Sequence, residues 1–173
     1  MEIPRWFDRT FPDKPPLEAF PFVIERLRGA PARIEERTAG LASDLLARRA
    51  VGAWSIQEHV GHLGDLEPLW FARLDDLISG QTELRPADLT NRRTHQAEHN
   101  RADLPSLLGV FRAERQRFVD RLDNMDSAEA GLTALHPRLK QPMRLIDHCH
   151  FVADHDDHHM ALISAMLRIA QRG

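Results

Sequence analysis

The chain has 173 residues and a formal net charge of −3, so it lacks the basic surplus that is typical of nucleic-acid-binding domains. It contains no run of about 18 uncharged apolar residues that could span a membrane and no secretory signal, and its single cysteine cannot form an internal disulfide. These features predict one soluble domain, residues 1–173, that resides in the cytoplasm and has neither nucleic-acid nor membrane partners.

The N-terminal part of the chain divides into an arm and a first helix. Residues 1–16 hold four of the eleven prolines, which predicts an extended arm. Residues 17–41 carry apolar side chains at helical spacing. Gly29 and Pro31 lie inside this stretch and should kink or split the helix.

A second helix is predicted to begin after Ser55. Ser55 can cap the helix while Glu58 reaches back to the backbone, and apolar residues then recur at helical spacing. Gly80 favours the left-handed turn that ends a helix. Pro68 lies inside the apolar pattern, so we expect a bend in this helix.

The rest of the chain predicts two more helices. Residues 81–102 are polar and predict a long loop, and residues 103–125 and 143–169 again show helical apolar stripes, with a second loop between them. We find no alternating apolar run long enough to predict a strand. The expected fold class is therefore all-α, a four-helix bundle with long connections in up-down-down-up or a similar order.

The last predicted helix places histidines on its apolar face. His155 and His159 lie one turn apart, at the spacing that lets two imidazoles converge on one ion. His148 shares the face but lies about 10 Å farther back along the axis, too far for comfortable sharing of that ion. Core histidines with hydrogen-bond partners are the alternative, since a buried imidazole without one costs about 1–3 kcal/mol.

A third ligand has two candidates in the second predicted helix. His59 lies closer to the centre of the apolar stripe than His62, which lies at its flank. However, His59 follows the cap at the position where it can pack against Trp54 as a hydrophobic staple. The helical wheel alone leaves the choice open.

Other polar residues have both functional and structural interpretations. Residues 95–99, "HQAEH", match a zinc-protease spacing, but their surroundings offer little to bury, so we expect a solvated loop. Arg115 interrupts an apolar stripe and is expected either to anchor an anionic substrate or to be a paired arginine at the bundle edge. Asp65 and Asp156 could orient ligand histidines or be surface charges.

Two segments resemble the DinB superfamily, the DinB/YfiT-like metalloenzymes: "WSIQEHVGHLGDLEPLW" and "FVADHDDHHMALI". The resemblance extends over about residues 20–168. It implies a four-helix bundle and a metal triad of His62, His155 and His159, and it favours a homodimer that associates through bundle faces. His62 is thus preferred over His59 by resemblance.

The resemblance implies a function around this triad. Three neutral imidazoles suit Zn²⁺, Ni²⁺, Fe²⁺ or Mn²⁺. Our first hypothesis is an enzyme that activates a low-molecular-weight thiol for S-transfer onto a small-molecule substrate, because the sequence shows no obvious catalytic carboxylate near the triad. The alternatives are a hydrolase that uses metal-bound water and a non-enzymatic, metal-stabilised, stress-induced bundle. Four further positions are candidates for the surrounding cavity or second coordination shell: His59, His148, Asp156 and Arg115.

Overall fold

The computed structural model describes residues 3–11 and 14–171. Its long helices are α1 (Phe20–Arg28), α2 (Ala30–Thr38), α4 (Ile56–Ile78), α6 (Leu104–Leu122) and α8 (Leu145–Ala170). Shorter elements connect them: α3 (Ser43–Leu46), α5 (Arg92–Gln96), α7 (Ser127–Ala130), β1 (Thr133–Leu135), β2 (Pro142–Arg144) and the 3-10 turns Trp6–Asp8, Leu17–Ala19 and His99–Arg101. No helix among the described residues is long and apolar enough to cross a membrane.

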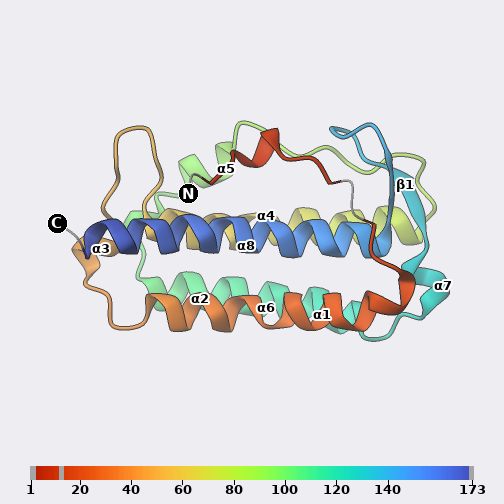
Figure 1. Cartoon of the computed structure of the whole chain (residues 1–173), viewed down its shortest axis with the longest axis horizontal. Coiled ribbons are helices and arrows are strands. Elements are labelled where there is room, and N and C mark those ends of the chain that lie inside the picture. Colours follow the sequence, from red (N-terminus) through yellow and green to blue (C-terminus); the bar gives the residue numbers. More distant parts are fainter. Residues whose placement is uncertain (1–2, 12–13, 172–173) are drawn as a thin grey trace.

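The long helices form an up-down-down-up four-helix bundle (Figure 1). The first rod consists of α1 and α2, which run in the same direction as α8, whereas α4 and α6 run in the opposite direction. Close contacts confirm that α4 and α6 are parallel. Gly64 lies against Phe111, and farther along both helices Nη2 of Arg121 forms an ion pair with Oδ1 of Asp75 at 3.2 Å. The predicted fold class and order are therefore confirmed.

Local sequence signals explain the helix boundaries. The predicted first helix is split at Gly29, and Pro31 lies in the first turn of α2. A proline is tolerated there because backbone N–H groups in the first turn have no partner within the helix. The side chain of Ser55 accepts from the backbone of Glu58, whose carboxylate accepts from the backbone of Ser55, so the predicted capping box is confirmed. The helix α4 continues through Pro68 as one element.

The prediction of one long solvated loop at residues 81–102 was only partly right, since residues 81–91 form no helix but the remainder does not stay a loop. This segment contains α5 and a 3-10 turn, and it packs on α4, with Thr94 and His99 buried. The close packing depends on Gly61 of α4, where an added Cβ would lie 2.3 Å from a ring carbon of His99. The segment is long because parallel neighbouring helices require a connection that returns along the bundle.

The expectation that the chain has no strand was wrong. Strands β1 and β2 pair in antiparallel register, with Ala134 opposite Met143, and Glu83 forms a bridge to Leu135. Three residues per strand are too few to produce a readable alternation of apolar and polar side chains. The hairpin covers one end of the bundle and places its loop, residues 136–141, beside α4.

The described part of the N-terminal arm packs against α8. The ring of Trp6 contacts that of Phe151 at a centroid distance of 4.9 Å, and Arg9 donates to Asp154 at 3.0 Å. The arm includes a 3-10 turn at Trp6–Asp8 and is thus partly helical, whereas residues 1–2 and 12–13 lie outside the described residues. The arm forms one wall of the cavity that the bundle leaves open.

Candidate metal centre

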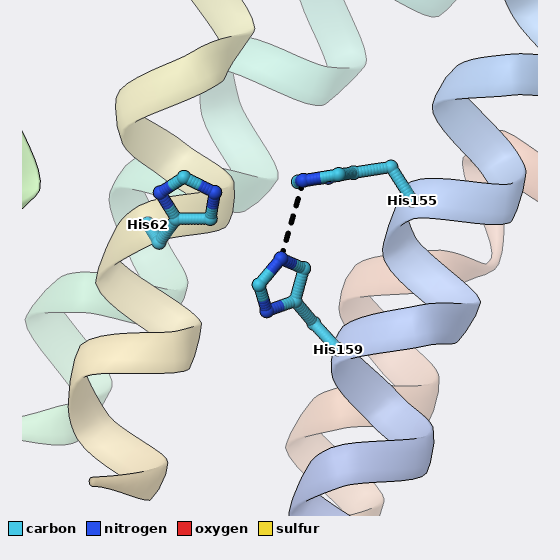
Figure 2. A group of neighbouring side chains, drawn as sticks. All are labelled: His62, His155 and His159. Atoms are coloured by element: carbon cyan, nitrogen blue, oxygen red, sulfur yellow. Dashed lines mark hydrogen bonds between the residues drawn. The ribbon is translucent and has the colours of Figure 1, made fainter. Parts of the chain in front are cut away.

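Three histidine side chains from two helices point toward a common centre (Figure 2). His62 comes from α4, and His155 and His159 come from successive turns of α8. Each ring offers one nitrogen that lies within 4.8 Å of those of the other two, and the Nε2 atoms of His155 and His159 are 3.2 Å apart. All three residues are buried, so the cluster lies inside the fold.

The His62 ring is held by a chain of hydrogen bonds. Its Nδ1 lies 2.9 Å from the Thr94 hydroxyl, and that hydroxyl donates to Asp65 Oδ2 at 2.9 Å. Because the Thr94 proton is committed to the carboxylate, the hydroxyl oxygen accepts from Nδ1–H of His62. A neutral imidazole carries one proton, so this assignment leaves a lone pair on His62 Nε2. Asp65 also accepts from His99 at 2.8 Å, which fixes the carboxylate in place.

His159 has an equivalent partner in His59. The Nδ1 atoms of the two rings are 2.9 Å apart. When His159 Nδ1–H donates to His59, the Nε2 of His159 keeps its lone pair and faces His155. The Nδ1 atom of His155 is buried and has no hydrogen-bond partner among the described residues. Hydrogen bonds at Nδ1 thus hold the rings of His62 and His159, whereas Nδ1 of His155 has no such bond.

The protonation states suit metal binding. Burial lowers the pKa of His62 to about 3, against the opposing effect of Asp65. Burial also holds the pKa values of His155 and His159 well below 6.5, and the neighbouring histidines add to the effect. All three rings are therefore neutral near pH 7. Two nitrogens bound to one tetrahedral zinc lie about 3.3–3.4 Å apart, close to the separation of the His155 and His159 nitrogens.

The histidines face a cavity of about 560 Å³. Its walls are mainly aromatic and apolar, and they come from the N-terminal arm, α4, the crossover segment, the hairpin loop and α8. Trp6 packs edge-on against His155 at a ring-centroid distance of 4.9 Å, and the ring centroids of Trp54 and His62 are 4.6 Å apart. The arm and the tryptophans thereby restrict access of water to the three nitrogens.

Three residues predicted for the cavity or its second shell lie elsewhere. Arg115 is 1% exposed and donates to Glu67 and Asp156, so it is a paired core arginine and does not anchor a substrate. Asp156 is committed to this arginine, and no described hydrogen bond joins it to a histidine. His148 is buried 3.3 Å from the carbonyl of Trp70, outside the cavity lining. His59, in contrast, lines the cavity.

Several contributing residues were missed at the level of sequence. Thr94 and His99 lie in the segment predicted to be solvated, yet both are buried, and His99 is only 7% exposed. The "HQAEH" spacing does not form a second metal site, since within residues 3–11 and 14–171 only His62, His155 and His159 meet as a possible metal group. Trp6 and the hairpin loop offered no motif, because their roles arise from tertiary packing.

Comparisons with known proteins agree with this architecture. Residues 26–163 match the sequence model of the DinB superfamily. YfiT from Bacillus subtilis, described as a probable metal-dependent hydrolase with an unusual four-helix bundle topology, superposes with a TM-score of 0.81 at 19% identity, covering 94% of each chain. No curated protein is significantly similar in sequence. Since the family match covers most of the chain, this protein belongs to the DinB superfamily.

Proposed function

We propose that this protein is a divalent-metal-dependent enzyme in which His62, His155 and His159 hold the ion, and that it hydrolyses a small-molecule substrate. The observation that carries the proposal is the convergence of three neutral imidazoles whose lone pairs face one point beside a cavity. The described function of YfiT supports hydrolysis as the reaction class.

The residues around the triad each have a defined task in this proposal. A bound divalent ion such as Zn²⁺, Ni²⁺, Fe²⁺ or Mn²⁺ supplies Lewis acidity, which lowers the pKa of a coordinated water or thiol. Thr94 and His59 hold the rings of His62 and His159 in their ligand tautomers. His158 lines the same cavity and can accept a proton from the attacking group, whereas the acceptor nitrogen of His59 is engaged by His159.

Thiol transfer is the second candidate. Within the described part of the chain, Asp88 is the only carboxylate residue that lines the cavity. The cavity therefore offers few candidates for a carboxylate general base. A thiol is more acidic than water, so a thiol held by an ion at this site would need only a weak base to accept its proton. A cavity of about 560 Å³ also has room for a substrate beside a small thiol.

Metal analysis of purified variants tests the ligand assignment. We expect one divalent ion per chain in the parent protein and none in His62→Ala or His155→Ala. His158→Ala is the matched control, since it removes an imidazole next to a proposed ligand and should retain the ion. Stoichiometric metal in either ligand variant would refute the triad.

Substrate assays distinguish the reaction classes. Hydrolysis of aryl esters or amides by the metal-loaded protein in the absence of any thiol would support the first candidate. Conjugation of an electrophile such as monochlorobimane only when a cellular thiol is present would support the second. If neither reaction occurs and chelation merely lowers the melting temperature, the triad is a structural metal site in a non-enzymatic bundle.

A further inference from the structure

The end of the cavity remote from the histidine triad contains two arginines without carboxylate partners. Arg73 belongs to α4 and Arg138 to the loop between β1 and β2, and both line the cavity. Neither forms an ion pair within residues 3–11 and 14–171. The Nη2 atom of Arg138 is buried and has no hydrogen-bond partner there. Buried cationic groups are normally paired, so within the described residues the buried Arg73 and the buried Nη2 of Arg138 lack the anionic partner that such groups usually have.

His136 sharpens this conclusion, because it presents a donor to the same place. Its Nδ1 accepts from the backbone N–H groups of Arg138 at 3.2 Å and Leu139 at 3.1 Å. The neutral ring therefore carries its proton on Nε2, which lies 3.3 Å from Nη1 of Arg73. Two hydrogen-bond donors thus face each other with no acceptor between them.

The protein's own nearby carboxylate is already committed. Asp76, the acidic residue that acts most strongly on Arg73, is bound by Arg85 through hydrogen bonds of 2.6 and 2.9 Å. Burial lowers the pKa of Arg73 to about 10, so its guanidinium stays charged near pH 7. Burial and the neighbouring arginines lower the pKa of His136 to about 3, so its ring stays neutral. The cluster is therefore cationic and rich in donors.

The wall between this cluster and the triad is apolar. Leu66 and Trp70 lie on α4 between His62 and Arg73 and line the cavity, as does Phe151 from α8. His62 and Arg73 are eleven positions apart on one helix, which separates their Cα atoms by about 16 Å along the axis. A ligand that fills the cavity is therefore elongated, with a polar group at each end and an apolar body.

We propose that Arg73, His136 and Arg138 form a carboxylate-binding subsite, and that the substrate is an elongated apolar molecule with a carboxylate at one end. The carboxylate accepts from the two guanidinium groups and from Nε2–H of His136, which supplies the missing acceptor. Its apolar body lies along Leu66 and Trp70. Placing its reacting bond at the histidine triad rests on the proposed function, whereas the carboxylate subsite itself does not.

Calorimetric titration with octanoate and with octanol tests the subsite. These probes share an apolar chain and differ in charge. We expect octanoate to bind the chelator-treated protein at least tenfold more tightly than octanol does. Arg138→Gln and Arg73→Gln should each weaken octanoate binding at least tenfold and leave octanol binding unchanged. Arg101→Gln, which removes a 79% exposed arginine side chain, is the matched control and should bind octanoate as the parent does.

The possible contrary outcomes are distinct. Equal binding of the two probes, octanoate binding that survives both substitutions, or no octanoate binding at millimolar concentration would overturn the subsite. Binding that disappears on chelation would place the carboxylate on the metal and would likewise overturn it. Melting temperatures identify a variant that has lost its fold, and Arg138 in the hairpin loop provides the less disruptive substitution. Failure of the triad to bind metal would refute the proposed function without affecting these titrations.

Discussion

Two buried polar clusters lie on different faces of α8, and they differ in how well their hydrogen bonds are satisfied. The first is the ion-pair cluster of Arg115, Glu67 and Asp156. All three guanidinium nitrogens of Arg115 donate there, to the two carboxylates and to the carbonyl of Leu27. The second is the histidine cluster of His62, His155 and His159. There the Nε2 atoms of His155 and His159 face each other, and Nδ1 of His155 has no partner among the described residues. The comparison supports the proposal that the satisfied cluster is structural and that the histidine cluster is a binding site.

Helix geometry explains how adjacent residues serve different clusters. His155 and Asp156 are consecutive, so their side chains point about 100° apart around α8. His155 faces α4 and the cavity, whereas Asp156 faces Arg115 of α6. A charged residue next to a ligand in sequence need not contribute to the metal site.

The largest effect that separates the clusters is expected from Arg115→Met. The substitution leaves Glu67 and Asp156 buried without a counter-charge, which should cost about 3–5 kcal/mol of unfolding free energy. Urea denaturation measures this cost, and metal stoichiometry should stay at the parent value. Replacing both carboxylates by leucine in the same chain should recover most of the loss. No recovery would mean that packing, and not charge, dominates at this site.

Next in size are substitutions at the residues that orient the histidine ligands. Thr94→Val and His59→Phe each remove the acceptor of one ligand's Nδ1–H. We expect metal affinity to fall about 10- to 100-fold in each, measured by competition with a chromophoric chelator. His95→Ala serves as the control, because it removes a histidine of the same segment as Thr94 that is exposed. Unchanged affinity in both test variants would show that these hydrogen bonds do not support the site.

A smaller effect is expected where the crossover segment meets α4. In Gly61→Ala the new methyl group would lie 2.3 Å from the His99 ring, which should destabilise the fold by about 1–3 kcal/mol. In a His99→Ala background the same change should become neutral or stabilising, since alanine favours helix more than glycine does. Thermal unfolding of the four proteins in this cycle measures the coupling. Simple additivity would contradict the contact.

The smallest effect is a pH dependence at Glu58. Burial raises the pKa of this carboxyl, but hydrogen bonds from Arg49 and Ser55 lower it more, from 4.5 to about 2. Its contribution to stability is therefore present above about pH 4.5 and is lost as pH falls toward 2. Because Arg49 is largely exposed, we expect Glu58→Gln to cost about 1 kcal/mol at pH 7. Urea denaturation should show this difference shrinking in acid; a constant difference would exclude the ion pair.

The sequence predicted features that depend on local periodicity. The long helices, the cap at Ser55 and the break at Gly29 each have a signal within a few residues, and the structure reproduces all three. The segment at residues 81–102 was misread because its buried side chains are polar, and their burial depends on a glycine about 40 positions earlier. Asp65 and His59 were candidates for orienting the histidines, and both belong to their hydrogen-bond network. Thr94 could not be predicted, because a hydrogen bond between distant segments leaves no periodic trace.

The parallel orientation of α4 and α6 has a consequence for the hydration of the histidine triad. After Ile78 the chain must travel back along the whole bundle before Leu104, and this return path brings Thr94 against His62. In a bundle whose consecutive helices alternate in direction, no polypeptide would pass that place, and solvent would supply the partner of this imidazole. The order of the helices therefore decides whether a protein side chain or bulk water lies against one side of the site.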